Sequence, residues 1–91
     1  MQFSMSLTPV EFERQLQPLL AGWEASRWEN GWRLDRAERS VAISWRPLAR
    51  LRLGALELPR LDVSLSFAGG SVEQDAGFID DFLRHFQRGG G

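Results

Sequence analysis

His85 is the only histidine of the chain and the residue best suited to acid–base or metal chemistry. Asp81 precedes it by four residues, a spacing that places both side chains on one face of a helix. Such a pair could supply two metal ligands or an acid–base couple. However, no third ligand or nucleophile is recognisable, and a cation near a helix C-terminus is stabilising by itself. We therefore interpret His85 as structural.

The residue types that the chain lacks exclude several reactions. Without Cys there is no thiol nucleophile, disulfide or thiolate metal site, and without Lys or Tyr there is no Schiff base or phenolic acid. Asp80 and Asp81 are neighbours, which point in different directions on a helix. The sequence therefore favours a protein that is not an enzyme and that uses no cofactor and no metal.

All eleven basic residues are Arg, which we attribute mainly to a GC-rich coding genome. Four Trp lie among these Arg, and together they suggest an alternative function, the stacking and charge pairing that bind single-stranded nucleic acid. Trp32 and Trp45 fall on the apolar phase of the strands, which leaves Trp28 free to be exposed, and the net charge is −1. We therefore do not expect nucleic acid as a partner. The Arg that would form the strip are Arg27, Arg33, Arg46, Arg50, Arg52 and Arg60.

The period of the hydrophobic residues predicts the elements that position these side chains. Strict alternation indicates strands at residues 2–7, 31–37, 41–46 and 61–67. Helical spacing indicates helices at 8–21 and 71–88, each opened by a capping box, Thr8-x-x-Glu11 and Ser71-x-x-Gln74. Pro18 should kink or break the first helix, and Asp80 and Arg84 should pair across one turn of the second.

Two segments are less regular. Asn30-Gly31 is a turn signal, and we expect an irregular approach to it with a short edge strand near residues 25–29. Pro47 is expected to end the strand 41–46. Residues 48–59 then form either a hairpin or a hydrophobic loop folded over the end of the core.

The order β-α-β-β-(β)-β-α predicts an α+β domain in which two helices pack on one face of an antiparallel sheet. This order resembles that of helix-grip and TATA-binding-protein-like architectures. Larger helix-grip proteins hold an apolar ligand between helix and sheet, which implies binding of a small apolar ligand as an alternative function. We expect one domain over residues 1–88 and a flexible Gly tail at 89–91.

Our leading hypothesis is a protein-interaction or adaptor domain whose partner is another protein or a second copy. We see no signal peptide and no apolar run of membrane-spanning length, so a cytoplasmic protein is expected. The expected interaction surface combines a leucine-rich segment with a serine-rich sheet face flanked by Arg. Its residues are Leu51, Leu53, Leu56, Leu58, Ser44, Ser64, Ser66, Arg33 and Arg46.

Overall fold

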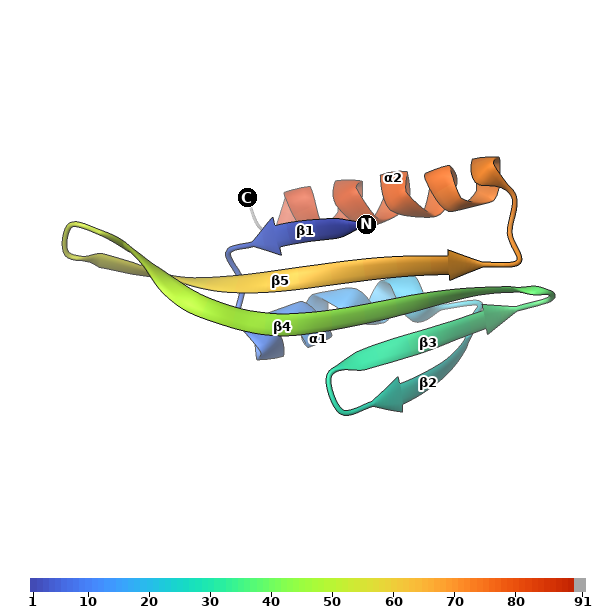
Figure 1. The fold of residues 1–91 in the computed structure, drawn as a ribbon, viewed down its shortest axis with the longest axis horizontal. Coiled ribbons are helices and arrows are strands. Elements are labelled where there is room, and N and C mark those ends of the chain that lie inside the picture. The colour runs from blue at the N-terminus through green and yellow to red at the C-terminus, as the bar shows by residue number, and fades with distance from the viewer. Residues whose placement is uncertain (90–91) are drawn as a thin grey trace.

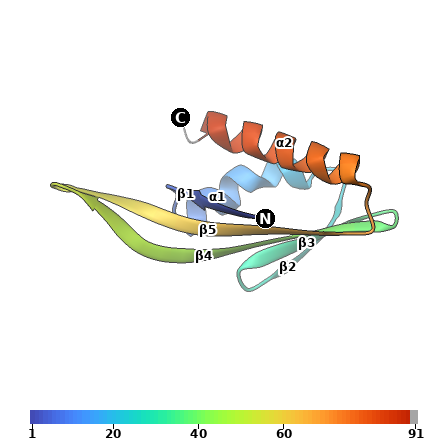
Figure 2. The ribbon, with the colours of Figure 1, turned by 45° about the horizontal axis from the view of Figure 1, so that its top comes forward.

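A five-stranded antiparallel sheet carries two helices on one face (Figure 1 and Figure 2). The computed structural model describes residues 1–89, with side chains through residue 86. This arrangement confirms the α+β class and the expected layout. The elements are β1 (Gln2–Met5), α1 (Pro9–Leu16), the 3-10 helix η1 (Gln17–Leu20), β2 (Glu24–Trp28), β3 (Gly31–Arg36), β4 (Arg39–Leu53), β5 (Leu56–Ala68) and α2 (Val72–Gly89), and the strand order is β1-β5-β4-β3-β2.

Local signals set the helix ends where the sequence predicts them. Thr8 Oγ1 accepts the backbone N–H of Glu11 at 3.2 Å, and a Glu11 carboxylate oxygen accepts the backbone N–H of Thr8 at 2.9 Å. Ser71 and Gln74 make the same reciprocal pair before α2. The break at Pro18 is also confirmed, because α1 ends at Leu16 and the chain tightens into η1.

The predicted turn at Asn30-Gly31 is wrong by one residue. Trp28 pairs with Gly31, so the two loop residues are Glu29 and Asn30. The short edge strand expected near residues 25–29 is confirmed as β2, and it pairs regularly with β3 instead of forming an irregular approach. Gly31 is required by close packing rather than by the turn. A Cβ there would lie 2.5 Å from both the Ile43 carbonyl oxygen and the Trp28 indole nitrogen.

Two glycine substitutions should therefore change stability in opposite directions. Gly31→Ala should lower the free energy of unfolding by about 1–3 kcal/mol, because the new methyl group meets backbone and a large ring. Gly77→Ala should raise it by about 0.5–1 kcal/mol, because Gly77 lies within α2 with nothing within 4 Å of the added Cβ. Urea unfolding of both variants tests this, and equal effects would contradict the packing argument.

Pro47 does not end a strand, which corrects a further expectation. The Trp45 N–H donates to the Asn30 carbonyl, so the backbone nitrogen of Trp45 faces the β3 side of β4. Backbone direction repeats every two residues in a strand, so the nitrogen of Pro47 faces the same side. Pairing of β3 with β4 ends at Gly31 and Ser44, so no neighbouring strand needs an N–H from Pro47. β4 therefore continues to Leu53 and pairs with β5 along its outer half.

The core lies between the sheet and the helices. Phe82 is fully buried and its ring neighbours those of Phe3, Phe12, Phe78 and Phe86, at centroid distances of 4.8–6.5 Å. The fully buried strand residues beneath these rings are Leu34, Val41, Ile43, Leu61, Val63 and Leu65.

The expected Gly tail begins at a helical residue, since α2 extends to Gly89, and Gly90–Gly91 lie outside the described residues. Within residues 1–89, neither helix combines the length and the hydropathy that crossing a membrane requires.

Candidate functional site

The outer halves of β4 and β5 form a two-stranded arm that extends beyond the rest of the sheet (Figure 1). β1 pairs with β5 only as far as Met5 and Leu61, and β3 leaves β4 after Ser44. Within residues 1–89, the segment 46–60, here called the arm, therefore has no neighbouring strand on either side. The molecule is elongated as a result, with extents of 48 × 25 × 20 Å. Of the two alternatives for residues 48–59, the hairpin is the one that forms.

The leucines of the arm share one face because the register shifts by one residue between Leu48 and Leu51. Beyond this bulge Leu51 pairs with Leu58, and Leu53 with Leu56. Without the extra residue in β4, Leu51 and Leu53 would lie on the face opposite Leu56 and Leu58. Leu51, Leu53 and Leu56 are 40%, 57% and 58% exposed, and Leu58 is partly buried.

The serine-rich sheet face is continuous with this leucine face. Alternate residues of β5 from Leu56 to Ser66 point to one side, away from the helices. Ser44 lies opposite Ser64 in the register, and Ser66 is connected through Ala42 to Arg33. The structure thus brings all nine residues of the expected interaction surface onto one face of the sheet.

The arm also concentrates positive charge. It contains Arg46, Arg50, Arg52 and Arg60 against Glu57 alone, so the remaining residues hold an excess of acidic groups. Arg52 lies 3.6 Å from Glu57, and Arg46 lies 3.3 Å from Asp62 on the body of the sheet.

The expected nucleic-acid strip is largely neutralised within the protein. Besides Arg46 and Arg52, Arg27 pairs with Glu13 at 3.1 Å and Arg33 with Asp35 at 3.2 Å. Among its six arginines, four are therefore engaged in ion pairs. Trp28 is the tryptophan exposed on the open sheet face, at 43%.

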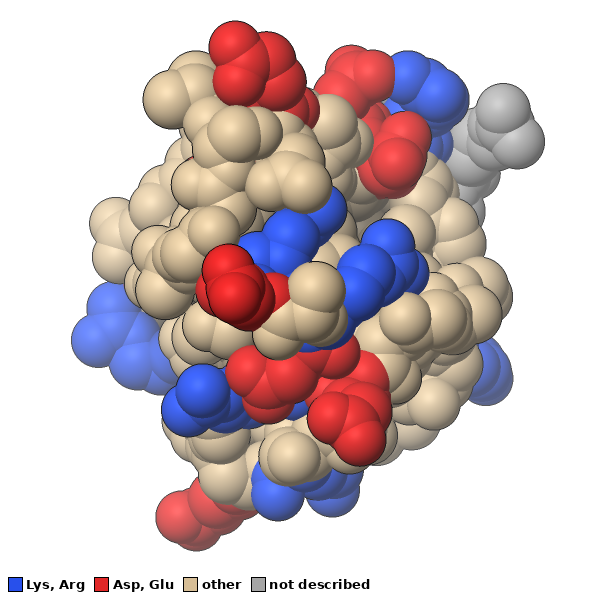
Figure 3. All heavy atoms as spheres, turned by 90° about the vertical axis from the view of Figure 1, so that its right-hand side faces the viewer, with Lys and Arg blue, Asp and Glu red and all other residues tan. Residues whose placement is uncertain are grey.

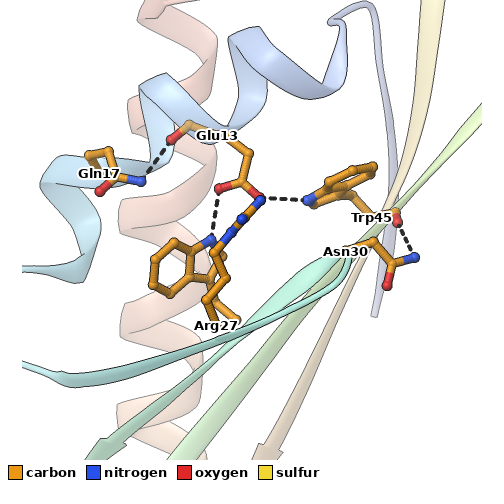
Figure 4. A network of polar contacts seen from close by, with 6 residues as sticks. Glu13, Gln17, Arg27, Asn30 and Trp45 are labelled. Atoms are coloured by element: carbon orange, nitrogen blue, oxygen red, sulfur yellow. Dashed lines mark hydrogen bonds and ion pairs between the residues drawn. The ribbon is translucent and has the colours of Figure 1, made fainter.

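Glu13 of α1, a carboxylate for which the sequence predicts no role, organises a polar network beneath the helix (Figure 4). It accepts hydrogen bonds from the indole N–H groups of Trp32 at 2.8 Å and Trp45 at 3.0 Å. Arg27 from the edge strand adds a third at 3.1 Å. Trp32 and Trp45 lie on the apolar phase of their strands, and a buried indole N–H needs a hydrogen-bond acceptor. This requirement is the sequence signal that indicates a polar partner such as Glu13 beneath the helix.

The environment of Glu13 acts on its pKa in two directions. Burial raises the pKa, but the hydrogen bonds from Trp32, Trp45 and Arg27, with the charge of Arg27, outweigh it. The pKa of Glu13 is therefore lowered from its ordinary value, and the carboxylate is ionised at neutral pH. Because its oxygens already accept three bonds, we assign it to holding α1 on the sheet rather than to catalysis.

The structure gives His85 and Asp81 separate roles. His85 Nε2 donates a hydrogen bond to the Gln15 carbonyl oxygen and so connects α2 to α1. Asp81 lies 3.8 Å from Arg84, which also pairs with Asp80 as expected. No group of three His, Asp or Glu side chains positioned to hold a metal occurs in the part of the chain that the structure describes.

An apolar hollow of about 360 Å³ lies between β1 and α2. Phe3, Met5, Leu7, Leu83 and Phe86 line it together with two serines. It lies beside the edge strand β1, whereas the rings of Phe78 and Phe82 pack between sheet and helix nearer the N-terminus of α2.

Comparison with known proteins adds no relative, since neither a protein-family model nor a curated protein matches the chain.

Proposed function

We propose that the protein is a non-enzymatic interaction module that self-associates through the arm. The observation that carries this proposal is the single leucine face of residues 51–58, exposed on a hairpin that extends away from the core. Apolar side chains gathered at this density on a projecting element are typical of contact sites. Full burial of one leucine contributes about 1.5–3 kcal/mol, so three of them supply a substantial part of an association energy.

The edges of the arm support the same proposal. The backbone groups of residues 46–53 that face the β3 side have no strand beside them, and neither do those of residues 56–60 on the β1 side. Open strand edges pair readily with another chain. A partner strand beside the arm would satisfy these groups and cover the leucines.

Charge favours a second copy as the partner. The arm is basic, whereas the rest of the same chain carries more acidic than basic residues. On the helix side, residues 72–86 of α2 contain four acidic residues and a single arginine, Arg84. The acidic residues are Glu73, Asp75, Asp80 and Asp81. Two copies can therefore place each arm against an oppositely charged region of the other.

The test is the mass in solution across a concentration series, by light scattering coupled to size exclusion at low and high salt. We expect a dimer that the double variant Leu53→Ser/Leu56→Ser weakens by about 100-fold in Kd. The matched control is Val10→Ser/Val72→Ser, which removes two valines exposed at 74% and 82% on the helices. A monomer at every concentration, or equal effects of both double variants, would contradict self-association through the arm.

The hollow between β1 and α2 favours a second candidate function, the binding of a small apolar ligand. Its volume of about 360 Å³ suits such a ligand, and its walls are mainly apolar side chains. The arm has the stronger support, because its exposed leucines are costly to a protein that leaves them uncovered.

A further inference from the structure

A second polar cluster lies at the end of the molecule opposite the arm. At this end the β3–β4 turn approaches the start of α2 (Figure 1). Arg36 and Arg39 are cross-strand partners beside this turn, so both side chains leave the sheet on the same side. Their guanidinium carbons lie 4.3 Å and 4.8 Å from the centre of the Trp23 ring. Trp23 in turn packs edge-on against Phe78 of α2, which fixes its position.

Within the part of the chain that the structure describes, these two positive charges have no carboxylate partner. Among the described residues, no Asp or Glu oxygen lies within 4.0 Å of either guanidinium, although six other ion pairs are formed. Arg36 Nε donates to the Gly22 carbonyl at 3.0 Å. Arg39 Nε is buried and has no acceptor within the described residues. A buried donor without an acceptor, next to a second positive charge, is costly in free energy.

Both arginines line one surface hollow of about 360 Å³. Trp23 and Leu19 form apolar walls, and Gln74 and Asp81 from α2 lie across from the arginines. The stacking on Trp23 holds the planar guanidinium groups in place while leaving N–H edges available. Figure 3 shows Arg side chains in the middle of this end of the molecule, with acidic groups around them.

We propose that this hollow binds a small phosphate-type oxyanion between Arg36 and Arg39. Such an anion would accept hydrogen bonds from the guanidinium N–H groups of the two arginines that line the hollow, and it would balance both charges. Asp81 opposes the anion, because it lines the same hollow and Arg84, 3.8 Å away, offsets its negative charge only in part. The residues of this hollow are distinct from the leucines that carry the proposed self-association, since the arm of the same chain lies at the other end of the molecule.

Titration with inorganic phosphate at constant ionic strength tests the site, followed by NMR of the Arg Nε–H and Trp indole N–H signals. We expect saturable shifts at Arg36, Arg39 and Trp23. Arg36→Gln and Arg39→Gln should each weaken binding by about tenfold or more. Asp81→Asn should tighten it by about threefold or more, because a repulsive charge is removed.

Two further variants keep the result interpretable. Arg36→Lys retains the charge but loses the planar fork, so it should weaken binding while leaving the cluster folded. Arg14→Gln removes an exposed charge on α1 and should leave the phosphate affinity within about twofold. A phosphate monoester that binds more tightly than free phosphate would identify a phosphorylated ligand as the source. Shifts that chloride reproduces, or equal weakening by Arg14→Gln, would overturn the proposal.

Discussion

Phe82→Ala should lower the free energy of unfolding by about 3–5 kcal/mol, the largest effect expected of any single substitution. Phe82 is fully buried, and its ring neighbours four other Phe rings that come from β1, α1 and α2. Removing it leaves a cavity at the point where these elements meet. A domain of this size is stable by only about 5–14 kcal/mol, so the variant should be near the limit of folding. Urea unfolding monitored by Trp fluorescence measures the loss.

Two controls separate the cavity from other effects. Phe82→Leu keeps much of the volume and should cost only of order 1–2 kcal/mol. Leu56→Ala removes an exposed side chain of the arm and should change stability by less than about 0.5 kcal/mol at low protein concentration. A loss below about 1 kcal/mol for Phe82→Ala would show that the rings of the core can collapse into the space.

Glu13→Ala should lower the free energy of unfolding by about 2–3 kcal/mol, although its side chain is 18% exposed. The substitution removes the acceptor of the Trp32 and Trp45 indole N–H groups and the partner of Arg27. Glu13→Gln keeps one acceptor oxygen and should cost less, about 1–2 kcal/mol. Glu29→Ala, an acidic residue exposed in the β2–β3 turn, is the matched control and should cost less than about 0.5 kcal/mol.

The same network predicts a pH dependence. The folded-state pKa of Glu13 is lowered from 4.5, so its ionised form is favoured by folding. Its contribution is therefore fully present above about pH 5 and is lost as the pH falls through the folded-state pKa. Urea unfolding from about pH 7 to about pH 3 should show a steeper loss for the wild type than for Glu13→Gln. Parallel curves for the two proteins would mean that protonation of Glu13 does not contribute.

The predictions that succeeded rest on interactions between residues close in sequence. Thr8 and Glu11 form a capping box three residues apart, and Pro18 ends the α-helix through its own missing N–H. Strand alternation likewise predicts the buried side of the sheet, on which Val41, Ile43, Val63 and Leu65 lie. Each of these signals acts within one element or at its end, so residues close in sequence contain the physical cause.

The corrections share the opposite property. Pro47 interrupts a strand only if a neighbour needs its N–H, and the end of β3 decides that. Glu13 is an unremarkable helix residue until Trp32 and Trp45 come beneath it from two different strands.

The sequence alone therefore determined the α+β class, the helix ends and the apolar side of the sheet, because local backbone preferences and hydrophobic periodicity encode them. Only the tertiary structure decided that residues 46–60 form a projecting arm, that a bulge gathers its leucines on one face, and that Arg36 and Arg39 meet over Trp23. These features depend on which distant strands end beside one another. No periodicity along a single segment encodes that information.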